Sequence, residues 1–537
     1  MSTLWHPDRT STHPEVLGDG PLPPGLWEAF LAYDRALLGN DVPALDAAFA
    51  PGDATLRADG TGVSRGHATI AAFRAARPAA PDRRLVRVHV RLPADGVALL
   101  VAEVASPTGA PGLQTQLWQR VEGRWRVAAA HVTAPARPLD TSVWRVAGAP
   151  LVAPTASGPL DGLGVAVKDL FAVAGQPVGA GVPAFLAERA PEARHASAVA
   201  ALLDAGASLL GIAQTDELAY SVSGVGGRWG TPAHPTAPGR VPGGSTNGPA
   251  VAVARGEAAV GLGTDTAGSI RVPGSYLGLW GLRTSTGLVD TAGLLPLAPS
   301  FDAVGWLTAD GATLLRVAEA LLPDVPERDG RPGELVTVPA LTARAEPEVA
   351  EAVRGAAEAL GAVPLDLDVD CDAWFEAFRV VQGFEAWRTH GAWVTGHPGA
   401  LSGEVAARLA WAAGVTGAQH EAARAVLADA AAFLRAALAD RVLLLPATAT
   451  PAPPLADPEA LAAARDRTLR LTCLASLAGL PALTMPAPGT GPGQPPLGLG
   501  LVGPAGRDLP LLRFALGAAA TLAGDRPHHA QPSTETT

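Results

Sequence analysis

A proline-rich stretch divides this chain of 537 residues into two parts with different patterns of apolar residues. Such a stretch is typical of a linker, and its prolines are Pro135, Pro138, Pro150, Pro154 and Pro159. The chain is long enough for two or more domains. We therefore predict a disordered N-terminus over 1–22, a small domain over 23–133, a linker over 134–160, a large domain over 161–525 and a disordered tail over 526–537.

The part before the prolines predicts a small α+β domain. Apolar residues first recur at helical spacing, and segments of alternating polarity follow them. The expected helices are 26–38, 42–49 and 66–76, and the expected strands are 85–92, 96–106, 114–121 and 125–132. The short Gly-containing segment 122–124 joins the last two strands as a hairpin. Helices followed by a meander of strands indicate an α+β arrangement.

The part after the prolines predicts one large α/β domain. Short apolar segments alternate there with Ala-rich helical segments. The expected strands include 165–167, 208–212, 258–262, 442–445 and 483–485, and the expected helices include 197–204, 251–255, 347–361 and 402–439. Because 48% of the residues are hydrophobic and only 17% are charged, a well-buried core is favoured over disorder.

Charge, cysteine content and apolar stretches limit which binding partners and which cellular compartment the sequence favours. The net charge of -11 would repel a phosphate backbone, so we expect no nucleic-acid partner. Cys371 and Cys473 form no CxxC pair and no metal-ligand cluster, which favours two buried, reduced thiols. The N-terminus lacks the apolar core of a signal peptide, and Gly and Pro residues interrupt the apolar stretch 471–488. We therefore expect a cytoplasmic protein without a membrane partner.

Lys168 is the single lysine of the chain, which has 40 basic residues besides histidine. The apolar segment GLGVAVK, 162–168, would carry its side chain into the interior of the large domain. Arginine keeps its proton in proteins, whereas burial lowers the pKa of a lysine. Lys168 is therefore a candidate general base, and an incidental surface lysine is the alternative that the apolar segment argues against.

Two turns rich in glycine and serine follow in the large domain. The first is VPGGSTNG, 241–248, which precedes an apolar helix, and the second is GLGTDTAGSIRVP, 261–273, which follows a strand. Glycine permits unusual backbone angles, and consecutive small residues let several backbone N–H groups converge. Taken singly, a helix N-cap at Ser245 or Thr246 and an ordinary Gly-rich turn would explain them.

The two turns and the segment around Lys168 together resemble the signature of the amidase signature family. This family includes fatty acid amide hydrolase, malonamidase and indole-3-acetamide hydrolase. The resemblance runs through about residues 145–525 and includes the segments 211–244 and 474–486. It implies an α/β fold with a mixed central sheet covered by helices, and amide hydrolysis through an acyl-enzyme. It implies no cofactor and no metal.

The same resemblance implies a role for each residue of the signature. Ser269 is the nucleophile, Lys168 is the base, and Ser245, which a cis peptide bond holds in the family, passes a proton between them. The oxyanion hole is formed by the backbone N–H groups of Thr266, Ala267, Gly268 and Ser269. Thr246 and Thr264 supply supporting hydrogen bonds, and Asp265 and Arg271 form a buried pair that fixes the loop.

The sequence departs from the family at two positions, because Ala267 and Asn247 stand where glycine is common. Alanine keeps its backbone N–H, so we expect the oxyanion hole to survive. The helical region 370–440 corresponds to a variable part of the family that shapes the substrate pocket. Which of its residues do so is not readable from the sequence.

The N-terminal domain resembles a nuclear transport factor 2-like cone. It is similar to the small companion proteins of amidases that act in cyanuric-acid and oxalurate breakdown. The segments 30–38, 40–49, 73–78 and 117–133 carry this resemblance. Such cones hold a ligand or dimerise, so a homodimer is one expectation. His131 and Trp118 are candidates for a cone pocket, and packed core positions are the alternative for each.

Three other patterns do not carry a function. The segment 498–503 fits GxGxxG, but GTGPGQPP precedes it where a dinucleotide site needs a strand, so we predict that 498–503 is itself a strand. His420 begins HEAAR rather than the zinc motif HExxH. The chain has no GxSxG elbow.

The sequence therefore predicts an amidohydrolase that releases ammonia or an amine from a small linear amide. Ureido acids and arylacetamides are the candidate substrates. One alternative is the ammonia-producing subunit of a tRNA-dependent amidotransferase, which the N-terminal cone does not suit. The other is a catalytically silent scaffold, against which the presence of Ser269, Ser245 and Lys168 argues.

Overall fold

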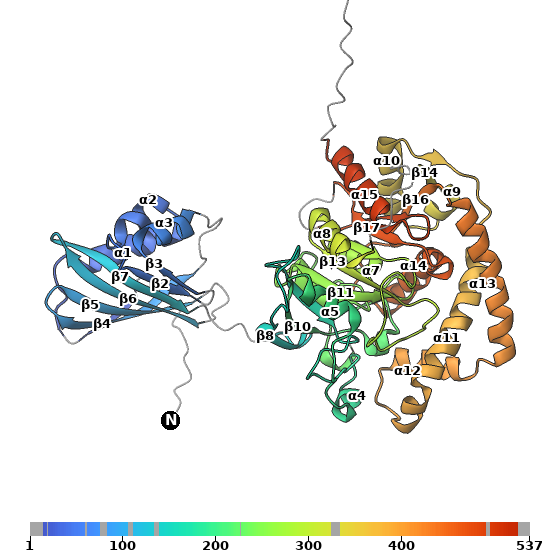
Figure 1. The fold of residues 1–537 in the computed structure, drawn as a ribbon, viewed down its shortest axis with the longest axis horizontal. Coiled ribbons are helices and arrows are strands. Elements are labelled where there is room, and N and C mark those ends of the chain that lie inside the picture. The colour runs from blue at the N-terminus through green and yellow to red at the C-terminus, as the bar shows by residue number, and fades with distance from the viewer. Residues whose placement is uncertain are drawn as a thin grey trace, which may run out of the picture. The chain divides into compact units, whose positions relative to one another are not determined.

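The computed structural model describes residues 14–18, 20–59, 62–75, 83–105, 111–133, 139–225, 227–323, 333–489 and 494–524. The chain divides into two compact units, Met1–Pro138 and Leu139–Thr537 (Figure 1). The predicted tail over 526–537 lies outside the described residues, and so does most of the predicted N-terminal segment over 1–22.

The first unit is a seven-stranded sheet with three helices, which confirms the predicted α+β cone. Its strand order is β1-β4-β5-β6-β7-β2-β3, and β4 to β7 form the predicted antiparallel meander. The strands are β1 (Glu15–Gly18), β2 (Leu56–Asp59), β3 (Gly62–Arg65), β4 (Arg84–Ala94), β5 (Val97–Ala105), β6 (Pro111–Val121) and β7 (Arg124–Thr133). The helices are α1 (Leu26–Leu38), α2 (Val42–Ala48) and α3 (His67–Ala75).

Strand β1 contradicts part of the prediction that residues 1–22 are disordered. Glu15–Gly18 pairs in parallel with Arg87–Val90 of β4, and Arg87 Nε lies 2.7 Å from the Glu15 carboxylate. All four residues of β1 are exposed. An edge strand of this kind is held by backbone hydrogen bonds, so its sequence needs no apolar alternation, which is the signal that predicts strands.

The core of the first unit lies between its helices and its sheet. It shows whether the two residues proposed for a cone pocket, Trp118 and His131, are packed in the core. Trp118 is buried, its indole Nε1 donates to Gln116 Oε1 at 2.9 Å, and its ring packs edge-on against Tyr33. Trp118 is therefore a packed core residue. His131 is exposed on β7, so it is neither a core residue nor a residue of an interior pocket.

The second unit is built on a mixed eleven-stranded sheet, which confirms the predicted fold class. The order is β15-β14-β16-β18-β17-β12-β13-β11-β9-β10-β8. The strands are β8 (Trp144–Val152), β9 (Gly164–Lys168), β10 (Ser208–Ala213), β11 (Val260–Asp265), β12 (Trp280–Arg283), β13 (Ala303–Thr308), β14 (Glu334–Thr337), β15 (Val363–Pro364), β16 (Arg441–Pro446), β17 (Ala482–Pro486) and β18 (Gly498–Val502). Strand β18 is the one predicted at the GxGxxG pattern.

Helices cover both faces of this sheet, as β16 illustrates. The helices are α4 (Pro183–Glu188), α5 (Ser197–Asp204), α6 (Asn247–Ala254), α7 (Arg271–Leu277), α8 (Gly311–Leu321), α9 (Pro339–Thr342), α10 (Pro347–Leu360), α11 (Cys371–Gly396), α12 (Gly403–Ala413), α13 (Gly417–Ala437), α14 (Pro458–Ala478) and α15 (Asp508–Leu522). Leu443 and Leu445 belong to the cluster with α11, α13 and α14, whereas Val442 and Leu444 belong to the cluster with α8, α10 and α15 (Figure 1). Alternate residues of a strand point to opposite faces, so a strand covered on both sides is apolar throughout.

Strand β8 contradicts part of the predicted linker over 134–160. Trp144–Val152 pairs antiparallel with β10 and forms one edge of the large sheet. Pro150 of β8, whose peptide bond with Ala149 is cis, is one of the prolines from which the linker was predicted. Proline is compatible with an edge strand because the N–H that it lacks can be one that faces away from the sheet.

Three further features bear on the sequence predictions. The helical region predicted over 402–439 consists of two helices, because α12 ends at Ala413 and Thr416 caps the start of α13 with a capping box. Cys371 and Cys473 are both buried and unpaired, as predicted. Within the described ranges, none of the helices combines the length and the apolar character needed to cross a membrane.

Candidate active site

The sheet brings the three predicted catalytic residues to neighbouring elements. Lys168 is the last residue of β9, and Ser269 lies in the turn between β11 and α7. Strands β9 and β11 are parallel neighbours, with Val167 opposite Leu262, so their carboxyl ends meet at one edge of the sheet. Ser245 lies just before α6, and the backbone N–H of Thr246 donates to the carbonyl of Ser269 at 3.3 Å.

Lys168 is completely buried and is held by three hydroxyl groups. Its Nζ donates to Ser245 Oγ at 2.8 Å, to Thr264 Oγ1 at 2.9 Å and to Thr246 Oγ1 at 3.0 Å. The two threonines that were predicted to support the site therefore both contact the lysine. Three fixed contacts hold the amine beside the Ser245 hydroxyl, which is the geometry that a proton transfer between them requires.

The environment of Lys168 lowers its pKa to about 7. Burial is the largest cause, because removal from water disfavours the ammonium form. The carboxylates of Asp216, Asp265 and Asp302 act in the opposite direction and raise the pKa again. The balance leaves an amine that is neutral in a substantial fraction of molecules near pH 7, as a general base must be.

The backbone around Ser245 is held by a second set of contacts. The Gly244–Ser245 peptide bond is cis. The carbonyl of Ser245 accepts hydrogen bonds from Thr215 Oγ1 at 2.8 Å and from the backbone N–H of Asp216 at 3.2 Å. Ser245 is fully buried, so its hydroxyl has little freedom besides the contact with Lys168.

Asn247, one of the two departures from the family pattern, takes part in the same network. Its Nδ2 donates to Asp216 Oδ1 at 3.2 Å, and its Oδ1 accepts from the backbone N–H of Gly248 at 2.8 Å. Burial raises the pKa of Asp216 to about 6, and the backbone N–H of Gly224 and the charge of Lys168 oppose that rise. The asparagine therefore contributes to holding a carboxylate that lies near the lysine.

The turn that carries Ser269 is fixed by the carboxylate of Asp265. Asp265 Oδ1 accepts from Arg271 Nη2 at 2.8 Å, and Asp265 Oδ2 accepts from Arg271 Nε at 3.0 Å. Burial would raise the pKa of Asp265, but the charges of Arg271 and Arg283 and the Arg271 hydrogen bonds hold it well below its ordinary value. The structure thus places the predicted pair in two-point contact, and it adds Arg283, which the sequence did not single out.

One predicted oxyanion donor is already occupied in this arrangement. The backbone N–H of Gly268 donates to Asp265 Oδ1 at 2.7 Å, so it points to the carboxylate and is not free for an oxyanion. For the backbone N–H groups of Thr266, Ala267 and Ser269, no hydrogen bond is found among the described residues. These three N–H groups remain the candidate donors. The sequence could not distinguish them from Gly268, because all four lie in one turn.

Thr472 of α14 is a site residue that sequence reasoning missed. Its Oγ1 donates to the carbonyl of Ala267 at 2.5 Å, and its own carbonyl accepts from Arg271 Nη1 at 2.7 Å. Some 200 residues separate it from the turn, so no local pattern could connect the two. The segment 474–486 was part of the family resemblance, but it begins two residues later.

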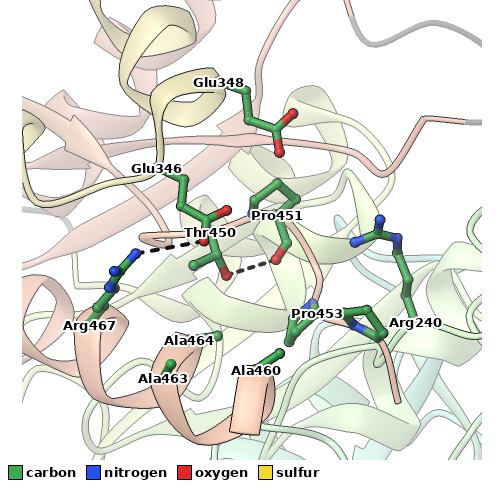
Figure 2. Close-up of a pocket in the computed structure, with 11 residues that line it drawn as sticks. Arg240, Glu346, Glu348, Thr450, Pro451, Pro453, Ala460, Ala463, Ala464 and Arg467 are labelled. Atoms are coloured by element: carbon green, nitrogen blue, oxygen red, sulfur yellow. Dashed lines mark hydrogen bonds and ion pairs between the residues drawn. The ribbon is translucent and has the colours of Figure 1, made fainter. Parts of the chain in front are cut away.

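A pocket of about 290 Å³ lies elsewhere in the second unit (Figure 2). Arg240 and Arg467 bring positive charge to it, Glu346 and Glu348 bring negative charge, and Arg467 lies 3.7 Å from Glu346. Lys168, Ser245 and Ser269 are not among its lining residues.

His420 is on α13, and among the described residues no group of three or more His, Cys, Asp or Glu is placed to hold a metal ion.

Comparison with known proteins matches two family models, one on each unit. Residues 146–365 match the model described as Amidase, and residues 22–137 match the model described as AtzH-like. The 2-amino-5-chloromuconic acid deaminase of Comamonas testosteroni is 36% identical over 391 residues, which cover 68% of this chain and 82% of the deaminase. Amidase 1 of Oryza sativa subsp. japonica is 47% identical over 186 residues, which cover 35% of this chain and 42% of that protein.

A solved structure agrees with these matches. It is an inhibitor-bound complex from work on the evolutionary origins of an s-triazine catabolic enzyme. Its TM-score to this chain is 0.63 at 26% identity, over 68% of this chain and 84% of the solved one. The part of the rice protein that this chain matches is only about two fifths of that protein's length.

The mixed sheet and its helices form the fold of a solved amidase that is 30% identical to this chain over 72% of its length, at a TM-score of 0.62. The chain belongs to the amidase family, whose members cleave the carbon–nitrogen bonds of amides, and it carries an AtzH-like domain at its N-terminus.

Proposed function

We propose that this protein hydrolyses a small linear amide through an acyl-enzyme formed on Ser269. The observation that carries the proposal is the contact of 2.8 Å between Lys168 Nζ and Ser245 Oγ, made by a fully buried lysine whose pKa is about 7. A serine hydroxyl is a weak nucleophile until a base can take its proton. We propose that Lys168 does this through Ser245.

The reaction proceeds in two halves. In the first, Ser269 Oγ attacks the amide carbon while its proton passes to Ser245 and the proton of Ser245 passes to Lys168. The free backbone N–H groups of the Ser269 turn donate to the oxyanion. The carbon–nitrogen bond then breaks, and the proton held by Lys168 returns through Ser245 to the leaving amine. In the second half, water attacks the acyl-enzyme along the same proton route, and the acid leaves.

A fluorophosphonate probe tests this proposal without knowledge of the substrate. We expect one adduct by intact mass, and peptide mapping should locate it on Ser269. The matched control is Ser275→Ala, because Ser275 is a buried serine of the adjacent helix whose hydroxyl contacts Thr448 Oγ1 at 2.9 Å. Ser275→Ala should label normally. A folded wild-type protein that takes up no probe would instead support the silent scaffold.

The substrate class is part of the proposal. We propose an amide that carries an acid group, such as a ureido acid, and the deaminase of Comamonas testosteroni, whose named substrate is an acid, supports this class. A panel of ureido acids, arylacetamides and simple amides, scored by ammonia release, tests it. Preference for arylacetamides would contradict this choice and leave the hydrolase mechanism in place. Release of ammonia only in the presence of a second subunit would favour the amidotransferase alternative.

We also propose that the protein forms a homodimer through its AtzH-like domain. The match of this domain to the AtzH-like model and the solved relative described as a protein complex support an assembly of subunits. Light scattering of the full chain should give twice the mass of one chain, and a monomer at micromolar concentration would contradict the proposal.

A further inference from the structure

The carboxylate of Asp302 lies against the first residue of the Ser269 turn. Asp302 comes directly before β13, which pairs antiparallel with β11 so that Ala303 lies opposite Asp265. The same register places Asp302 beside Thr266, and Asp302 Oδ1 accepts the hydroxyl of Thr266 at 2.6 Å. Both residues are buried.

The other oxygen of Asp302 fixes the carboxylate itself. Asp302 Oδ2 accepts from the backbone N–H groups of Leu297 at 2.8 Å and Ala298 at 3.0 Å. The carboxylate is therefore held by its own loop on one side and holds Thr266 on the other. A hydroxyl bonded to a carboxylate at this distance is among the stronger hydrogen bonds in proteins.

The bond to the Thr266 hydroxyl restrains more than a side chain. Threonine is branched at Cβ and has few accessible χ1 angles, so a fixed hydroxyl also fixes the direction of its Cα–Cβ bond. The peptide groups on either side of Thr266 are oriented with it. Two of the three candidate oxyanion donors, the N–H groups of Thr266 and Ala267, belong to these peptide groups.

We propose that Asp302 is a positioning residue for the amide hydrolysis. It holds Thr266 so that the backbone N–H groups of Thr266 and Ala267 face the oxyanion. This inference rests on the proposed function. It differs from a purely structural role because Asp302 acts on the rate of the chemical step and not only on the stability of the fold.

Asp302 also influences the base. The charged groups around Lys168 are the carboxylates of Asp216, Asp265 and Asp302, and each raises the pKa of the lysine against the effect of burial. Burial raises the pKa of Asp302 itself to about 6, and its hydrogen bond from Thr266 opposes that rise. A neutral side chain at position 302 therefore lowers the pKa of Lys168. The pH at which the base becomes active should shift to a lower value.

The experiment measures the rate constant and the affinity of fluorophosphonate labelling of the full chain as a function of pH. The variants are Thr266→Val, which is nearly isosteric but lacks the hydroxyl, Thr266→Ser, which keeps it, and Asp302→Asn. The matched control is Ser285→Ala, because Ser285 Oγ donates to the buried Asp508 Oδ2, also at 2.6 Å, and this pair does not contact the Ser269 turn. Thermal unfolding is recorded for every variant.

We expect Thr266→Val to lower the maximal labelling rate about tenfold to a hundredfold, as misplacement of a donor does, with little change in probe affinity. Thr266→Ser should recover most of this rate. Ser285→Ala should lose stability without losing rate. Asp302→Asn should lower the rate and move the pH midpoint downwards.

Several results would overturn the inference. One such result is a labelling rate of Thr266→Val equal to that of the wild type. Another is a rate loss in Ser285→Ala as large as that in Thr266→Val. Either result would show that the Asp302 carboxylate serves only the stability of the fold. If Asp302→Asn does not fold, the two Thr266 variants still decide. An unlabelled wild-type protein would reject the proposed function and this inference with it. Labelled wild-type and Thr266→Val proteins with equal rates would reject only the inference.

Discussion

Arg145 of β8 forms a buried ion pair with Asp169, the residue that follows Lys168. Arg145 Nε lies 3.0 Å from Asp169 Oδ1, and both side chains are at least nine-tenths buried. The backbone N–H of Gly179 also donates to Asp169 Oδ1 at 3.0 Å. The edge strand of the sheet is thereby tied to the position next to the lysine, although the two residues are 24 positions apart.

Removal of this partner should destabilise the protein. We expect Arg145→Gln to lower the free energy of unfolding by about 3–5 kcal/mol, because it leaves a buried carboxylate without its counter-ion. The control is Arg354→Gln, which removes an exposed ion pair with Glu351 and should cost less than about 1 kcal/mol. Denaturant unfolding measures both. Equal losses for the two variants would contradict the importance of the buried pair.

The loss of stability in Arg145→Gln should be smaller at low pH than at high pH. Burial raises the pKa of Asp169 to about 6, above its ordinary value, so the native protein binds this proton more tightly than the unfolded chain does. The stability contributed by this group is present at low pH and is lost as the pH rises through the folded pKa. Without Arg145 the pKa rises further. We therefore expect a smaller loss of stability for Arg145→Gln at pH 5 than at pH 8, and a loss independent of pH would contradict this account.

Ser269→Ala should abolish probe labelling and amide turnover, because it removes the attacking oxygen. The thermal unfolding midpoint should stay close to that of the wild type, since no hydrogen bond of the Ser269 hydroxyl is found among the described residues. Turnover near the wild-type level would show that another residue is the nucleophile.

Lys168→Arg should be nearly as damaging. Arginine keeps the positive charge but cannot release its proton at neutral pH, so the variant has no base. A general base contributes about a hundredfold to ten-thousandfold to the rate, and a loss of this size is expected. Steady-state turnover measures the loss, and circular dichroism checks the fold. If Lys168→Arg kept most of the activity, the lysine would be a structural group.

The rate should follow the titration of Lys168. Since the pKa of the lysine is about 7 and only the neutral amine accepts a proton, kcat/KM should rise with pH and level off above a midpoint near 7. Below the midpoint the rate should fall about tenfold per pH unit, as for a single proton. A profile that is flat between pH 5 and 9 would argue against a lysine base.

Gly268→Ala should damage both the turn and the activity. Gly268 has a φ of +134°, a conformation that residues with a Cβ rarely adopt, and an added Cβ would lie 3.0 Å from Thr472 Oγ1. A forced backbone conformation of this kind costs about 1–3 kcal/mol. Gly287→Ala is the control, because Gly287 also has a positive φ but open space around its Cβ position. Only Gly268→Ala should lose labelling of Ser269.

Much of the fold could be predicted because its elements have local signals. The meander β4 to β7 alternates in polarity, and β9, β10 and β11 are apolar runs between helices. Strands β1 and β8 could not be predicted, since both lie at sheet edges, where backbone pairing replaces apolar patterning. A short exposed segment and a proline-containing segment then look like disorder and linker.

The candidate site divides in the same way. Lys168, Ser245 and Ser269 were predicted from compact motifs, and the contact between Lys168 and Ser245 agrees with the predicted order of proton transfer. Thr472 and Asp302 were missed because their contacts with the Ser269 turn are set by how α14 and β13 pack beside it. The engagement of the Gly268 N–H with Asp265 depends on the orientation of one peptide group, which residue types do not determine.

The position of β8 decides where the chain can be divided. The amidase match begins at residue 146, so a cut placed there would remove Arg145 and the start of β8. The shortened protein would leave the Ala213 end of β10 without its partner Trp144, and it would leave the Asp169 carboxylate buried beside the lysine without a counter-ion. A catalytic fragment meant to work alone therefore has to begin at about Leu139, before the family match starts.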